Sequence, residues 1–180
     1  RSNAINTGQY SVSAATGYNS KSENIGHHSV SVVTSCESNV IAKGFYSIAT
    51  STGSASTATT KGGFSSAINT GSFSNSITDG KSSISASTGN LSVAKSVGKR
   101  SVAVSTGDES VSAVEGSDCI AIVTGRYGKA AGALGCWLVL SEIGDNDGIL
   151  DVQTVKVDGV NIKPNVYYQL VKGKVVKTNY

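Results

Sequence analysis

The sequence predicts an all-β fold: a parallel β-solenoid with about 18 residues and two strands per coil, closed by a small antiparallel β cap at the C-terminus. Three observations predict it. Glycine recurs every nine residues, a serine precedes each of these glycines by six residues, and alternate nine-residue units differ in a regular way. Fixed periods are typical of repeat proteins, in which each unit buries its inner side by stacking on its neighbours.

The nine-residue unit reads x-x-S-x-(A/S)-x-x-x-G. Its glycines are Gly8, Gly17, Gly26, Gly44, Gly53, Gly62, Gly71, Gly80, Gly89, Gly98, Gly107, Gly116 and Gly125, with Ser35 in the single gap. Its serines are Ser2, Ser11, Ser20, Ser29, Ser38, Ser47, Ser56, Ser65, Ser74, Ser83, Ser92, Ser101 and Ser110, followed by Cys119. Because side chains alternate across a strand, the serine and the small residue after it both point inward. We therefore expect a thin core whose hydroxyls bond to one another or to the corner backbone, with Cys119 as a small buried thiol.

A longer period of 18 residues lies over the first. Every second unit carries Thr before its last residue, at Thr16, Thr34, Thr52, Thr70, Thr88, Thr106 and Thr124. In the same units an aliphatic residue follows the repeat serine, except at Ser66, whereas the intervening units mostly carry polar residues there. One coil is therefore two units, each a strand of about six residues followed by a glycine-containing corner. Glycine at a corner permits either a positive φ or the close approach of the next coil.

The two outer faces of the solenoid differ in polarity. One face carries Thr together with a long series of branched aliphatic residues, which is more apolar surface than a soluble monomer normally exposes. We expect this face to be buried against other copies of the chain, as the interface of a homo-oligomer, and the pattern leaves dimer and trimer open. The interface residues are Val12, Val30, Val32, Ile48, Ile68, Ile84, Val102, Val104, Ile120 and Ile122.

The repeat ends near residue 134, so we expect a solenoid over 1–134 and a cap over 135–180. The C-terminal segment has the pattern of strands joined by two tight hairpins, with turns at Asp158-Gly159 and Lys172-Gly173. The ordinary hydrophobic core that the repeats lack is expected from Trp137, Leu138, Leu140, Tyr167 and Leu170. A cap is expected because the end of a solenoid otherwise exposes unpaired strand edges.

The units SVSAATG, SIATSTG, SVAVSTG and SVAKSVG resemble the head repeats of YadA-like trimeric autotransporter adhesins. The resemblance implies a β-roll with an apolar inner sheet at a trimer interface, although adhesin heads commonly repeat at about fourteen residues. The segment GALGCWLVLSE with VKVDGVNIKPNVYYQLVKGKVV resembles a C-terminal module of phage and prophage proteins. These resemblances imply a fibre or appendage of a phage virion, or alternatively a bacterial cell-surface adhesin or lectin-like module. Either protein would contact a host cell-surface glycan or protein.

Tyr10, His28, Tyr46 and Phe64 recur at 18-residue intervals, so we expect them to stack along one corner of the rod. Two interpretations of this aromatic ladder remain open. Its rings could bind sugars by stacking, or they could pack against a neighbouring protomer.

Other classes of site have little support in the sequence. The histidines, His27 and His28, are neighbours without a second ligand pair, and the segment 145–148 lacks the spacing of a calcium loop. No metal and no cofactor is expected, and no residues form a catalytic group, so we expect no enzyme activity. Thr rows occur in ice-binding solenoids, but here aliphatic residues flank a single row. With a net charge of +3, scattered basic residues and no long apolar run, we expect neither nucleic acid nor membrane as a partner.

Overall fold

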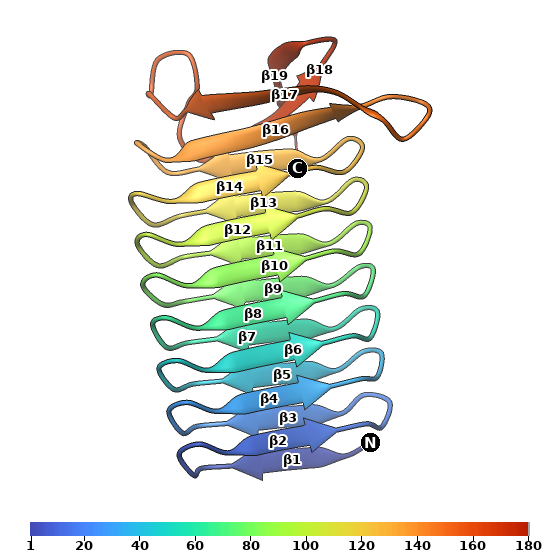
Figure 1. Ribbon diagram of the computed structural model, residues 1–180, viewed down its shortest axis with the longest axis vertical. Helices are drawn as coiled ribbons and strands as arrows, with labels where there is room; N and C mark the ends of the chain where they lie inside the picture. Colours follow the sequence, from blue (N-terminus) through green and yellow to red (C-terminus); the bar gives the residue numbers. More distant parts are fainter. Residues whose placement is uncertain (180) are drawn as a thin grey trace.

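The computed structural model describes residues 1–179, which form strands, turns and loops and no helix. Successive strands alternate between two sheets that face each other along a rod (Figure 1). The odd sheet contains β1 (Asn3–Asn6), β3 (Lys21–Asn24), β5 (Asn39–Ala42), β7 (Thr57–Thr60), β9 (Asn75–Thr78), β11 (Val93–Ser96), β13 (Val111–Val114), β15 (Lys129–Gly132), β18 (Tyr167–Val171) and β19 (Lys174–Thr178). The even sheet contains β2 (Val12–Ala15), β4 (Val30–Val33), β6 (Ile48–Ser51), β8 (Ser66–Asn69), β10 (Ile84–Ser87), β12 (Val102–Ser105), β14 (Ile120–Val123), β16 (Trp137–Ile143) and β17 (Ile149–Lys156).

The 18-residue coil is confirmed by the register of the sheets. Val12 of β2 pairs with Val30 of β4, and Val30 pairs with Ile48 of β6, always in parallel. Each repeat strand is four residues long rather than about six, because the five residues between strands, such as 16–20, form the corner. The predicted β-solenoid is therefore correct, with shorter strands and longer corners than expected.

At each corner, one residue allows the close approach of a neighbouring coil and a different residue adopts a positive φ. The repeat glycine is needed for close approach: a Cβ placed on Gly62 would lie 2.0 Å from the carbonyl oxygen of Gly44 in the preceding coil. The positive φ falls instead on the residue two positions later, where Phe64 has a φ of 56°. The backbone N–H of Phe64 donates to the carbonyl of Lys81 in the following coil (2.9 Å), and this bond helps to hold the uncommon conformation.

The repeat serines form hydrogen-bonded ladders inside both corners. At Ser56, the hydroxyl accepts a bond from the backbone N–H of Ser38 (3.1 Å) and lies 3.2 Å from the carbonyl oxygens of Ser35 and Ser54, to which it donates. Cys119 takes the same position at the end of its ladder, fully buried, and its Sγ accepts from the N–H of Ser101 (3.3 Å). The expectation that inward hydroxyls bond to one another or to the corner backbone is confirmed for these ladders, mainly through the backbone.

The core between the repeat strands is made of small side chains, as expected. The second and fourth residues of each strand point inward, and most are Ala or Ser, with Val33 and Val40 among the largest. Two buried asparagines close the ends of strands. Asn69, for example, donates to the carbonyl of Ser56 (3.0 Å) and accepts from the N–H of Gly71 (3.0 Å).

The cap closes each sheet in a different way. β16 still pairs in parallel with β14, and β17 then covers its edge in antiparallel orientation. On the other sheet, β18 pairs with β15 through Ala130 and Tyr168, and β19 pairs with β18. The parallel stack thus extends into the segment expected to be the cap, beyond the turn at residue 134 (Figure 1).

The hydrophobic core of the cap contains Leu138, Leu140 and Leu170, as predicted. The prediction is wrong for two other residues, Trp137 and Tyr167. Trp137 is 44% exposed because it precedes Leu138 on β16 and therefore points to the outer side of the sheet. Tyr167 is half-buried, and its neighbour Tyr168 occupies the core instead.

One of the two predicted hairpins is confirmed. Lys172 and Gly173 both have positive φ, 49° and 69°, and join β18 to β19. The hairpin predicted at Asp158-Gly159 is wrong, because β17 pairs with β16 across the turn at 144–148 and residues 157–166 form a loop. Asp158 organises that loop through its carboxylate, which accepts bonds from the backbone N–H groups of Val160, Asn161 and Ile162.

Candidate functional surfaces

The outer face of the even sheet displays all ten residues predicted to form an interface. They occupy the first and third positions of the even strands, and the Thr row lies beside them where each strand enters its corner. Val12 is 67% exposed and Ile84 47%, while others are partly covered by the coils above and below. β16 extends this face, since Trp137 pairs with Ile120 and Val139 with Ile122. Sequence reasoning missed both residues because they lie beyond the nine-residue repeat.

The outer face of the odd sheet mixes polar and apolar side chains and, unlike the even face over the described residues, carries ion pairs. The carboxylate of Glu23 accepts hydrogen bonds from the ammonium groups of Lys21 (2.6 Å) and Lys43 (2.5 Å). Both bonds lower the pKa of the Glu23 carboxyl, and the bond from Lys21 has the larger effect. Further along the rod, Lys95 pairs with Glu115 at 2.7 Å. The two faces of one thin rod therefore have different chemistry, although their backbones are equivalent.

The aromatic ladder is present as predicted. The ring centroids of Tyr10 and His28 are 4.9 Å apart, those of His28 and Tyr46 5.0 Å, and those of Tyr46 and Phe64 5.2 Å. The interplanar angles are between 4° and 11°, so the two inner rings have each face covered by another ring. Sugar stacking needs an open ring face, whereas this ladder presents mainly ring edges. The stacked geometry thus leaves little open ring face for a sugar at the two inner rings.

The two histidines have separate roles. His28 is a rung of the ladder, while His27 lies beside it, where its Nδ1 accepts from the N–H of Phe45 (2.9 Å). Within residues 1–179, no group of three His, Cys, Asp or Glu side chains is placed to hold a metal ion. All three cysteines are free.

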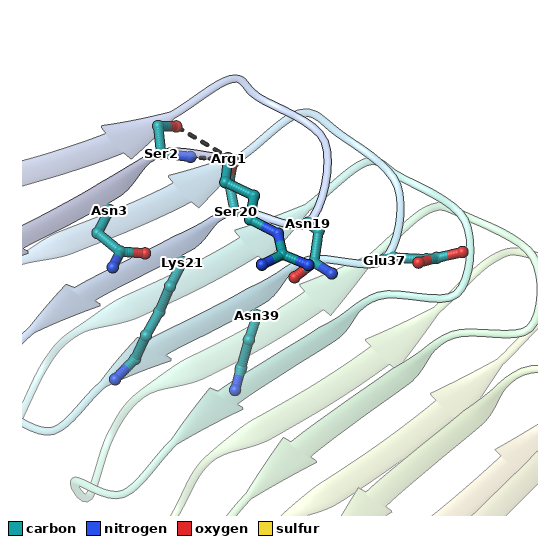
Figure 2. A pocket seen from close by; sticks show the side chains of 8 residues that line it. All are labelled: Arg1, Ser2, Asn3, Asn19, Ser20, Lys21, Glu37 and Asn39. Atoms are coloured by element: carbon teal, nitrogen blue, oxygen red, sulfur yellow. Dashed lines mark hydrogen bonds between the residues drawn. The ribbon is translucent and has the colours of Figure 1, made fainter.

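Two hollows lie beside the opposite corner, on its odd-sheet side, and sequence reasoning missed both; together we call them the corner groove. The first hollow, near the N-terminus, has a volume of about 490 Å³. Figure 2 shows Asn3, Lys21 and Asn39 projecting from neighbouring odd strands into this region, with Asn19 at the corner. A second hollow, of about 510 Å³, is lined by Leu91, Ser92, Val93, Glu109, Val111, Tyr127 and Lys129.

The two hollows occupy the same place on the coils, five coils apart. Asn3 corresponds to Val93, Lys21 to Val111 and Asn39 to Lys129, each 90 residues later. The first hollow is therefore polar, whereas the second has an apolar floor and an aromatic wall. The acids also lie on different coils. In the first hollow Glu37 has the place of Tyr127 and accepts a hydrogen bond from Tyr18, which raises the pKa of that phenol, whereas Glu109 has the place of Asn19.

The cap loop has one strongly perturbed carboxyl group. The carboxylate of Asp158 accepts hydrogen bonds from the N–H groups of Val160, Asn161 and Ile162 at 2.8–3.0 Å. These bonds lower the pKa of Asp158 to about 2, and the bonds from Ile162 and Val160 have the largest effects. The carboxylate is a structural centre of an exposed loop rather than a reactive group.

We expect NMR titration of Asp158 to give a pKa of about 2. Because this value lies below the unfolded value of about 3.9, Asp158 stabilises the loop above that pH and loses the effect as pH falls through about 2. Amide exchange of Val160 and Ile162 should accelerate over the same acid range. In the Asp158→Asn variant, exchange should be faster at neutral pH and no longer change across that range. A midpoint near 4 for Asp158 would contradict the bonding that the structure shows.

No protein-family model matches the chain, and no curated protein and no solved structure is significantly similar to it. In the part of the chain that the structure describes, no helix is long and apolar enough to cross a membrane. Function must therefore be inferred from the surfaces themselves.

Proposed function

We propose that this chain is a non-enzymatic structural and adhesive protein, a segment of a homotrimeric β-solenoid fibre or appendage of a phage virion. The observation that carries the proposal is the outer face of the even sheet. There, a row of aliphatic side chains, interrupted only by Ser66, and a mixed row of aliphatic, Ala and Thr side chains repeat at 18-residue intervals from β2 to β14. Trp137 and Val139 of β16 continue the two rows. Long exposed apolar patches of this kind mark contacts between proteins.

Self-association suits this face better than binding to an unrelated partner. A surface of parallel, identically spaced ridges is complementary to other copies of itself, and most homo-oligomers are closed and symmetric. The resemblance to YadA-like heads, whose inner sheet forms a trimer interface, supports three protomers around one axis. With the even sheets turned to that axis, the ion-paired odd sheet and the corner groove face outward.

The outward surfaces would then contact the host. A bacterial cell-surface adhesin is the second candidate, favoured by the same resemblance, and it uses the same rod and the same interface. In both cases the solenoid acts as a stiff spacer whose side chains, rather than any reactive group, carry the function.

The oligomer is tested by replacing Val104 with lysine. Val104 lies on the outer side of β12, so a charge there should prevent apolar burial and convert the trimer to monomer, with the β-sheet circular dichroism unchanged. Lysine is compatible with the coil, because Lys95 occupies the same strand position on β11. Analytical ultracentrifugation measures the change in mass.

Thr59→Lys is the matched control, since Thr59 has the third position of β7 on the odd sheet. This variant should remain trimeric. A monomeric wild-type protein, or a Val104→Lys protein that stays trimeric, would contradict the proposed interface.

A further inference from the structure

The second hollow of the corner groove spans three successive coils. On its corner side Leu91, Glu109 and Tyr127 follow one another along the rod, each with positive φ, and on its sheet side lie Val93, Val111 and Lys129. The floor is apolar, since Val93 and Val111 pair in register on β11 and β13. Its volume of about 510 Å³ is within the range of small-molecule sites.

Tyr127 is the aromatic wall of this hollow, and its ring is open. It is 67% exposed and, within residues 1–179, stacks on no other ring, in contrast to the inner rings of the aromatic ladder. Leu91, 45% exposed, forms the wall at the other end. An open aromatic face beside aliphatic groups is the surface on which the C–H side of a sugar ring packs.

The hollow also has one acid and one base free to bind hydroxyl groups. Glu109 and Lys129 line it, and in the described part of the chain neither side chain takes part in an ion pair. A carboxylate accepts hydrogen bonds and an ammonium donates them, which suits the hydroxyl rim of a sugar. Because the two charges are opposite, the site has no net attraction for an anion.

From this combination we infer that the hollow at Leu91–Tyr127 binds a neutral pyranose unit of a glycan. The sugar packs its C–H face on Tyr127 and the valine floor, and its hydroxyls bond to Glu109 and Lys129. The inference names the receptor chemistry of the proposed attachment function and in that sense rests on it. The equivalent hollow five coils earlier has Glu37 in the place of Tyr127 and no aromatic wall, so the specificity resides in these side chains and not in the backbone of the groove.

The test uses saturation-transfer NMR and calorimetry on the full chain, with the methyl glycosides of glucose, galactose, mannose and N-acetylglucosamine as neutral probes and N-acetylneuraminic acid as the acidic one. At least one neutral glycoside should bind, with saturation strongest at the protons of its C–H face. Tyr127→Ala should weaken that binding about tenfold, the size of one aromatic contact. Glu109→Gln should also weaken it, because an amide is a poorer acceptor than a carboxylate.

Two features keep the result interpretable. Ala55 has the same corner position with a φ of 54°, so alanine at position 127 is compatible with the backbone. Phe73→Ala removes an exposed ring from the same corner outside the hollow, and should leave binding unchanged. The Val104→Lys monomer should also bind the free glycoside, so failure of the trimer and failure of the sugar site are distinguishable. Binding that survives Tyr127→Ala, preference for the acidic sugar, or no binding of any neutral probe would overturn the inference.

Discussion

Replacing Gly62 with alanine is expected to lower the free energy of unfolding by about 3 kcal/mol or more, measured by chemical denaturation. The new Cβ would lie 2.0 Å from the oxygen and 2.4 Å from the carbon of the Gly44 carbonyl. Both are backbone atoms held in the stack, so neither can rotate away as a flexible side chain would. The coils must separate, and the hydrogen bonds between them must lengthen.

The control is Gly8→Ala, because the nearest atom to its Cβ is the Oδ1 of Asn6 at 3.3 Å. This variant should change stability by less than about 1 kcal/mol. Ser35 already illustrates the strain: beside it, the bond from the N–H of Thr34 to the carbonyl of Ala15 is 3.4 Å, against 3.1 Å for Thr52 to Val33 one coil later. Equal losses in the two alanine variants would contradict the role assigned to close approach.

Replacing Leu138 with alanine is expected to cost about 3 kcal/mol, the typical loss for a fully buried leucine. Leu138 is completely buried in the cluster that joins the last coils to the cap, where it lies between Ala121 of β14 and Val155 of β17. The small side chains of the solenoid core cannot move to fill the cavity. Thermal unfolding followed by circular dichroism should show a clear decrease in melting temperature.

Val152→Ala on the neighbouring strand is the matched control. Val152 is 51% exposed, so its truncation should cost less than about 1 kcal/mol. If both variants melted alike, the junction would not depend on the leucine, and the cap would contribute less to stability than its burial indicates.

The repeats could be read from the sequence because each position in the unit meets the same environment in every coil. The spacing of serine and glycine determined the register, and the alternation of strand residues assigned Val104 to the outside and Ala103 to the core. Period alone could not assign the positive φ, because residues as different as Tyr10, Ala55 and Arg100 adopt it. The conformation comes from the geometry of stacking and not from a residue preference.

The cap and the groove were harder to predict for physical reasons. At Asp158-Gly159 the sequence has a common hairpin signal, but three N–H bonds to the carboxylate stabilise a loop instead. The groove depends on residues such as Leu91 and Tyr127, 36 positions apart, that become neighbours of one site only when coils stack. Leu91 and Tyr127 each lie two positions after a repeat glycine. Aligning the residues two positions after every second glycine would have placed Leu91 and Tyr127 on the same corner.

The hydrogen bonds between coils run along the rod, as the pairing of Val12, Val30 and Ile48 illustrates. Tension along the axis therefore acts on the coils in series, and the weakest junction sets the strength. Each coil that opened would release about 60 Å of chain in place of roughly 4.8 Å of rod. A solenoid of this kind would lengthen greatly, without covalent rupture, under a strong pull along its axis.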